Sequence, residues 1–237
     1  MLFRSLIKRS PLFYRLIAGK NIGNVAFLAD RETNLVVEGF PRSGNTHAFH
    51  LIQSCFPNIV IGHHTHSVAA LNACMRFNLP LLVVVRVPLD SLASALVYRG
   101  QITGDPMHEA FCYLYRDYVD FFTTLNKVIR TSQCDVLVVS FETLTKSPES
   151  VIGEVLGRWG GRYKTVEDRT ISEICLNALA AHRLETDKQS ADCATLPSAE
   201  RAKKQAVAKH FLENEKSYEL ETLTNIYDRL CRQIRVI

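Results

Sequence analysis

The sequence has no CxxC pair, and none of its seven cysteines stands at zinc-finger spacing from a histidine. A structural zinc site and a thioredoxin-like redox centre are therefore not predicted. The number of cysteines is odd, and several lie inside apolar runs, where a free thiol behaves as a small hydrophobic group. This pattern favours a reducing compartment, and we expect a cytoplasmic protein, although the sequence leaves a disulfide open.

No stretch of the sequence is long and apolar enough to span a bilayer. The first twenty residues mix apolar and basic side chains, and the basic ones interrupt any apolar region of the kind found in a signal peptide. We expect residues 1–30 to form a helical extension that packs on the domain, because Pro11 breaks a long amphipathic face. The alternative is a peripheral contact of this basic segment with an anionic membrane surface.

A strong charge excess is also missing, because 28 Lys and Arg stand against 24 Asp and Glu, giving a formal net charge of +4. This surplus fits a site for a polyanionic small molecule, but it is too small to predict nucleic-acid binding. The chain has no internal repeat, low-complexity tract or linker, so we expect a single domain over 1–237. The sequence does not indicate an oligomeric state.

Strands and helices are expected to alternate along the chain. The run LLVVV at 81–85 is apolar throughout, which is typical of a strand covered on both faces in a parallel sheet. The alternation predicts an α/β fold with three layers and a mainly parallel sheet. The expected strands are 35–38, 58–61, 81–85 and 135–139; the expected helices are 46–55, 68–77, one from about residue 90, 107–130, 148–159 and 199–232; and 182–198 is expected to be a loop.

The segment LVVEGFPRSGNT predicts a phosphate-binding loop between a strand and a helix. Gly39 and Gly44 have the spacing of a nucleotide-triphosphate P-loop, and Thr46 stands where that motif has Ser or Thr. Glycines let the backbone approach a phosphate, and amides at a helix N-terminus donate to its oxygens. Asn45 occupies the position of the P-loop lysine, and the cation stands earlier, at Arg42. The lysine and magnesium arrangement of an NTPase is therefore not predicted.

GFPRSGNT resembles the 5′-phosphosulfate loop of sulfotransferases, whose usual form is P-[KR]-S-G-[TN]-T followed by tryptophan. The resemblance implies that the chain uses the donor 3′-phosphoadenosine 5′-phosphosulfate, without a metal ion. It also implies a P-loop-like sulfotransferase fold, and the similarity extends over about 36–160. The implied donor-binding residues of this loop are Arg42, Ser43, Gly44, Asn45, Thr46 and His47, with His47 in place of the tryptophan that stacks on adenine in soluble members.

A second motif, RVPLDSLAS, follows the strand at 81–85. Sulfotransferases have an arginine at the end of this strand and a serine eight residues later, and both bind the 3′-phosphate of the donor. Arg86 and Ser94 match that spacing. The planar guanidinium of arginine pairs two oxygens at once, which suits a phosphate ligand. A third similar segment, 134–160, supports the fold and places Phe141 near the expected adenine site.

HHTHS at 63–67 resembles the K-T-H-x-P segment of soluble sulfotransferases, in which the histidine is the catalytic base. Thr65 and His66 match this pattern, so the resemblance implies that His66 is the base and that Arg42 neutralises the bridging oxygen of the donor. His63 and His64 remain competitors for the role of base. Three neighbouring histidines also suggest a metal site, but no Cys, Asp or Glu stands nearby in the sequence to complete it.

The resemblance fades after residue 160, where no R-K-G loop completes the 3′-phosphate site. Arg201, Lys203 and Lys204 are a substitute, or else a solvated helix face. The predicted activity is transfer of a sulfuryl group to a hydroxyl or amine of a small-molecule or glycan acceptor. Two alternatives stay open: a P-loop kinase or NTPase, and a non-catalytic nucleotide-binding protein.

Overall fold

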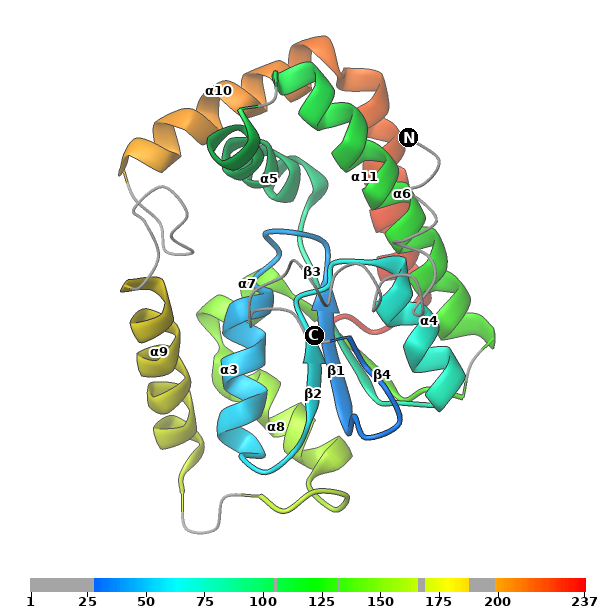
Figure 1. The fold of residues 1–237 in the computed structure, drawn as a ribbon, viewed down its shortest axis with the longest axis vertical. Helices are drawn as coiled ribbons and strands as arrows, with labels where there is room; N and C mark the ends of the chain where they lie inside the picture. Colours follow the sequence, from blue (N-terminus) through cyan, green and yellow to red (C-terminus); the bar gives the residue numbers. More distant parts are fainter. Residues whose placement is uncertain (1–27, 105, 132, 166–168, 188–198) are drawn as a thin grey trace.

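The computed structural model describes residues 28–104, 106–131, 133–165, 169–187 and 199–237. Its centre is a sheet of four parallel strands in the order β2-β1-β3-β4, as expected of an α/β fold with a mainly parallel sheet (Figure 1). The expectation for residues 1–30 falls almost wholly outside the described residues. The strands are β1 (Leu35–Gly39), β2 (Ile61–His63), β3 (Leu81–Val85) and β4 (Val136–Ser140).

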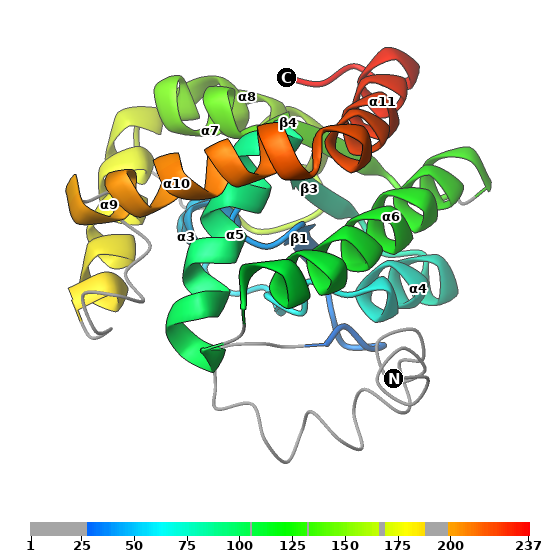
Figure 2. The same cartoon turned by 90° about the horizontal axis from the view of Figure 1, so that it is seen from above.

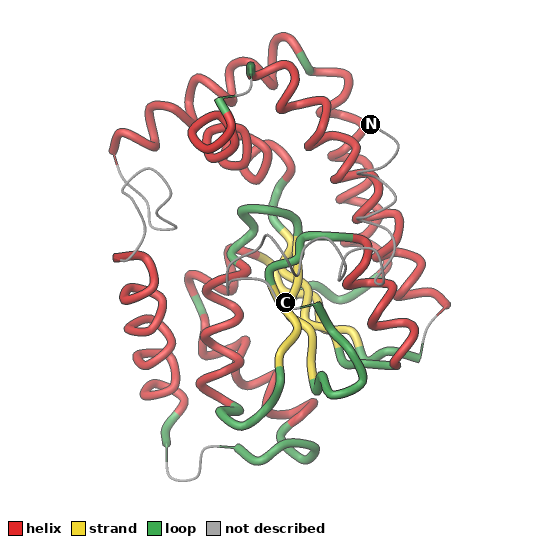
Figure 3. Tube along the Cα trace, in the orientation of Figure 1, coloured by secondary structure: helices red, strands yellow, loops and turns green. Residues whose placement is uncertain are grey.

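Both faces of the sheet are covered by helices, which gives the three predicted layers. Every residue of β1 and β3 is buried. Val83 and Val85 join the apolar core on one face, and Leu82 and Val84 join the core on the other. One face carries α3 (Asn45–Cys55), α8 (Pro148–Trp159) and α9 (Ile171–Asp187); the other carries α4 (Val68–Phe77), α6 (Met107–Thr131) and α11 (Ser217–Gln233), as Figures 1 and 3 show.

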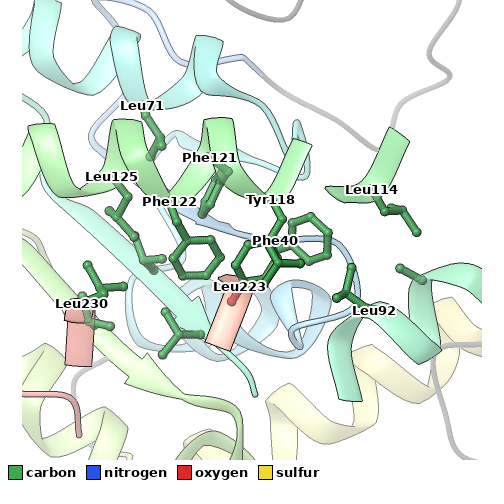
Figure 4. Packing of buried hydrophobic residues seen from close by; sticks show 14 of the residues in the cluster. Phe40, Leu71, Leu92, Leu114, Tyr118, Phe121, Phe122, Leu125, Leu223 and Leu230 are labelled. Atoms are coloured by element: carbon green, nitrogen blue, oxygen red, sulfur yellow. The ribbon is translucent and has the colours of Figure 1, made fainter. Parts of the chain in front are cut away.

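Phe40 ties the loop after β1 to the larger core. Its ring meets that of Tyr118 on α6 edge-on, with 4.8 Å between ring centroids, and Tyr118 stacks on Phe122 at 4.3 Å. Figure 4 shows these rings packed together, with Leu223 of α11 beside them. All four side chains are buried. The start of the phosphate loop is therefore held by apolar packing rather than left on the surface.

Two helices lie beyond the carboxyl ends of the strands, α5 (Pro88–Thr103) and α10 (Ala199–Glu215) (Figures 1 and 2). They pack closely on each other, and Lys209 of α10 forms an ion pair with Asp90 in the first turn of α5. Phe211 of α10 also meets Phe111 of α6. Helix α10 is thereby held beyond the carboxyl ends of the strands, where the phosphate loop lies.

Several predicted boundaries were wrong. The second strand is β2 at 61–63 rather than 58–61, and Val60 before it is exposed. Residues 182–187 belong to α9 rather than to a loop, because Ala178 and His182, four residues apart, are both buried on the side of α9 that packs on α3. The expected helix 199–232 is two helices that break at Lys216, since α10 packs on α5 whereas α11 packs on α6.

The last strand lies one residue later than expected, and it leads directly into a helix that was not predicted, α7 (Phe141–Lys146). The Ser140 hydroxyl caps α7 by accepting a hydrogen bond from the Thr143 amide. Trp159 is fully buried. The remainder of the predicted loop, 188–198, lies outside the described residues. No helix among those described is long and apolar enough to cross a membrane.

Gly39→Ala should destabilise the protein, because an added Cβ would collide with the Val84 carbonyl oxygen and stand 2.5 Å from Asn45 Oδ1. Overpacking of this kind costs about 1–3 kcal/mol. The matched control is Gly157→Ala in α8. Nothing lies within 4 Å of a Cβ added there, so alanine should raise the free energy of unfolding by roughly 0.5–1 kcal/mol. Urea unfolding of both variants checks the pair. Equal midpoints for the two variants would show that the approach of β1 to β3 does not require glycine.

Candidate functional site

The candidate site lies at the carboxyl ends of β1, β2 and β3, where one loop leaves each strand. The chain passes from β1 to β2 on one side and then returns to β3 on the other side of β1. Ligands of open α/β sheets bind at such a switch point. The loop 40–44 leaves β1 and Arg86 follows β3, so both predicted phosphate motifs meet at this edge of the sheet.

The loop 40–44 has the backbone of an anion-binding turn. Gly44, directly before α3, has φ 96, and Arg42 has φ 68, so two residues of the loop adopt the left-handed conformation. An added Cβ at Gly44 would also stand 3.0 Å from the Phe141 ring. Alternation of this kind turns successive amides toward one point, which attracts an anion. The Ser43 hydroxyl is buried in this turn and has no hydrogen-bond partner in the part of the chain that the structure describes.

Asn45, at the position of the P-loop lysine, points into the loop. Its Nδ2 donates to the carbonyl oxygens of Gly39 at 3.1 Å and Phe40 at 3.3 Å. Asn45 is buried, so its side chain braces the loop from inside. This position therefore supplies no cation to a ligand, as the sequence indicated.

Arginines from three separate elements supply the positive charge. Arg42 Nε and Arg201 Nη2 both donate to the Ser94 hydroxyl oxygen, each at 3.4 Å. Arg86 Nη1 donates to the Arg42 carbonyl oxygen at 3.0 Å. We call Arg42, Arg86 and Arg201 the arginine cluster. The sequence assigned Arg42 and Ser94 to different phosphates of the donor, whereas the structure places the two side chains in direct contact.

Two half-buried aromatic rings flank the arginine cluster. The Arg86 guanidinium lies 4.1 Å from the centroid of the Phe141 ring, and that of Arg42 lies 5.0 Å from the Tyr98 ring. Arg86 Nε is buried with no hydrogen-bond partner among the described residues, and burial lowers the pKa of Arg86, partly offset by Asp90. Arg201 is only 7% exposed. Cations gathered in this way are stabilised when an anion joins them.

The histidine segment after β2 is fixed by Glu38, a fully buried residue of β1 that the sequence analysis missed. Its Oε1 accepts from the amide and the hydroxyl of Thr65, both at 2.8 Å, and its Oε2 accepts from the His66 amide at 3.1 Å. Burial raises the pKa of Glu38, while the charge of His66 and these hydrogen bonds lower it. The one signal in the sequence was a single carboxylate within the otherwise apolar strand LVVEG.

His66 reaches back to the phosphate loop. Its Nδ1 lies 3.0 Å from the Gly39 carbonyl oxygen and 3.1 Å from Asn45 Nδ2. Both amide hydrogens of Asn45 already have carbonyl acceptors, so Nδ1–H of His66 is the donor to Gly39. The lone pair of a neutral His66 is then on Nε2. The side chain is 29% exposed, which leaves it accessible to a substrate.

Both ring nitrogens of His64 are already engaged. Nε2 lies 3.0 Å from the Thr46 hydroxyl oxygen, and Nδ1 lies 2.6 Å from His63 Nδ1. Burial, followed by neighbouring histidines, lowers the pKa of His64 to about 2 and that of His63 to about 4. The sequence left these two as competitors of His66, and of the three histidines His64 is held at both ring nitrogens.

A second group of histidines joins α3 to α9. The His47 ring lies 5.5 Å from that of His182, and His50 stacks on His182 at 6.0 Å. His50 is buried. His47 Nδ1 is buried without a hydrogen-bond partner, and burial lowers the pKa of His47. The loop expected at 182–198 gave no role to His182, which instead belongs to α9.

Despite the number of histidines, the described residues contain no group of three or more His, Cys, Asp or Glu arranged to hold a metal ion. The predicted donor-binding residues are brought together in the fold, from the loop 40–44 and α3 to Arg86 and Ser94. Arg201 of α10 also lies with them. The sequence allowed two interpretations of the three basic residues near this position: a substitute for the missing loop of the 3′-phosphate site, or a solvated helix face. The burial of Arg201 beside Ser94 shows that it is not a solvated residue.

No protein-family model and no curated protein sequence matches the chain. Among solved structures, the chain is similar to mouse sulfotransferase SULT7A1, which was solved as a complex with PAP. The two share 10% sequence identity over 86% of this chain and 91% of that chain, with a TM-score of 0.49. At this level the likeness assigns neither a family nor a function to the chain.

The lowered pKa values of His63 and His64 predict how stability depends on pH. The ordinary pKa of both groups is 6.5. Below pH 6.5 these histidines bind protons in the unfolded chain but stay neutral in the folded protein, so the free energy of unfolding decreases as the pH falls from 6.5 toward 4. His64→Gln removes one such group and should make this loss shallower. Urea unfolding between pH 4.5 and 7.5 measures it, with the exposed His108→Gln as control. Equal slopes for wild type and His64→Gln would contradict the burial of a neutral His64.

Proposed function

We propose that the chain is a sulfotransferase that moves a sulfuryl group from 3′-phosphoadenosine 5′-phosphosulfate to a hydroxyl or amine of a small-molecule or glycan acceptor. One observation carries the proposal: a P-loop-shaped turn whose lysine position is used internally by Asn45, and whose positive charge comes instead from three arginines. Such a site suits a nucleotide with two separate anionic groups and does not need a magnesium-bound triphosphate.

The phosphosulfate would lie in the turn, at the N-terminus of α3. Amides at this terminus, with Ser43, Asn45 and Thr46 in position, would donate to its oxygens. The 3′-phosphate would lie near Arg86 and Ser94, with Arg201 as a third ligand. This fits the buried polar atoms without partners, Ser43 Oγ and Arg86 Nε, because a phosphate oxygen would supply the acceptor that each lacks. His47, with its own buried and unpartnered Nδ1, would lie at the nucleotide side of α3.

His66 would act as the base. With Nδ1–H held by the Gly39 carbonyl, Nε2 is the nitrogen that can accept the proton of the acceptor as it attacks the sulfur. Arg42 would neutralise the charge that develops on the bridging oxygen as the sulfur–oxygen bond breaks. Gly39 thus connects the two groups, because it precedes the phosphate loop and also orients the base.

Two alternatives remain for the experiment to separate. A P-loop kinase or NTPase would need a cation at the position of Asn45, whose amide hydrogens are taken by loop carbonyls. A non-catalytic nucleotide-binding protein would bind the same donor without turnover. The first alternative predicts tight binding of ATP with magnesium, and the second predicts donor binding without transfer to any acceptor.

The chain should bind 3′-phosphoadenosine 5′-phosphate (PAP) without magnesium and should prefer it to AMP. Arg86→Ala should weaken PAP binding by about 2 kcal/mol, the scale of hydrogen bonds to charged groups, and should change AMP binding little. Calorimetry with PAP, AMP and ATP plus magnesium measures both effects, and Arg232→Ala on the exposed side of α11 is the control. Equal affinity of the wild type for PAP and AMP would refute the 3′-phosphate assignment.

His66→Ala should lower sulfuryl transfer by about a hundredfold or more, since general bases contribute at least that factor. Binding of PAP should persist, because His66 is assigned to the acceptor rather than to the donor. The measurement is single-turnover transfer from labelled donor to an acceptor found in a screen of phenols, alcohols, amines and glycans. His108→Ala, a largely exposed histidine on α6, should keep full activity. A His66→Ala variant with unchanged transfer would move the base elsewhere.

A further inference from the structure

A chain of three half-buried side chains leads from the end of β2 to the phosphate loop, and neither the donor nor the base assignment accounts for it. His63 Nδ1 faces His64 Nδ1 at 2.6 Å, and His64 Nε2 faces the Thr46 hydroxyl at 3.0 Å. Thr46 lies in the first turn of α3, beside the expected phosphosulfate. The path therefore ends at an atom that can touch the donor.

The chain can carry hydrogens in only two directions. Two facing ring nitrogens need one proton between them, because two lone pairs or two N–H groups would repel. If His64 carries its proton on Nδ1, its Nε2 accepts from Thr46, and the threonine hydrogen is turned away from the loop. If His63 donates to His64 instead, His64 Nε2–H donates to Thr46, and the threonine hydrogen is free for another acceptor.

Packing holds the two imidazoles in this arrangement. The His63 ring lies 4.0 Å from that of Phe49, which is on α3 three residues after Thr46, and the His64 ring meets Phe49 edge-on at 6.0 Å. His64 also has φ 58, a left-handed conformation that a side chain with Cβ adopts at a cost. Both rings lose their positive charge on burial, so each is a neutral donor and acceptor. The packing on Phe49 and the left-handed backbone of His64 therefore hold the two rings in a hydrogen-bond chain in which neither ring carries a positive charge.

We propose that His64 is a positioning residue for the donor, supported by His63, and that it orients the Thr46 hydroxyl to donate to a phosphosulfate oxygen. The inference rests on the proposed function. An anion beside Thr46 selects the second direction, because only then does the threonine hydrogen point to it. His63 Nδ1–H then donates to His64, and His64 Nε2–H donates to Thr46. His66, whose ring lies edge-on to that of His64 at 5.9 Å, takes no part in these hydrogen bonds and remains the base.

The test is a double-mutant cycle on PAP binding. Thr46→Val and His64→Leu should each weaken binding about tenfold, and the double variant should bind no worse than Thr46→Val alone, because both remove the same hydrogen bond. His64→Gln places an amide N–H close to the position of Nε2, so it should restore most of the affinity. His108→Leu is the control, and thermal melting confirms that each variant folds.

Additive losses in the cycle, or equal affinities of His64→Leu and wild type, would overturn the positioning role while leaving the proposed function intact. Failure of the wild type to bind PAP would instead count against the proposed function. In that case the same cycle is measured with inorganic sulfate as the probe of the loop. A non-additive loss with rescue by His64→Gln then supports the positioning role, and unchanged sulfate affinity overturns it.

Discussion

The buried carboxylate of Glu38 is the contact on which the site depends. It is a side chain of β1, yet it holds the segment after β2 by accepting one hydroxyl and two amide hydrogens from Thr65 and His66. Burial alone makes a carboxylate costly, and the three donors offset that cost. Without Glu38, these donors would lose their acceptor in the interior. Glu38 therefore holds the backbone of His66, while the Gly39 carbonyl orients its ring at the phosphate loop.

A second constraint is electrostatic and involves a residue far away in the sequence. Arg42 and Arg86 belong to loops of neighbouring strands, but Arg201 arrives on α10, more than a hundred residues later, and is buried against Ser94. Two of these guanidinium groups, those of Arg42 and Arg201, donate to the same hydroxyl, and like charges this close repel each other. The packing of α10 on α5, with the ion pair between Lys209 and Asp90, holds them together. This packing keeps positive charge concentrated at a place where a bound anion would reduce the repulsion.

Much of the fold could be predicted from the sequence, because its signals are local. Unbroken apolar runs such as 81–85 predict buried parallel strands, and the glycines of the phosphate loop predict a turn before a helix. Glu38, Arg201 and His182 could not be assigned, since their roles arise from contacts between elements far apart in the chain. The break at Lys216 was missed for the same reason: both sides of it have helical sequences, and only the helices they pack against differ.

The inward side chain of Asn45 has a consequence for how a ligand would associate. By bonding the carbonyls of Gly39 and Phe40, it removes conformational freedom from the turn before any anion is present. A flexible loop must lose that freedom at the moment of binding, and the lost entropy reduces affinity. Here the ordering occurs during folding instead. The turn is therefore preorganised for recognition. Its affinity for an anion depends on the fixed directions of its amides more than on any later adjustment of the backbone.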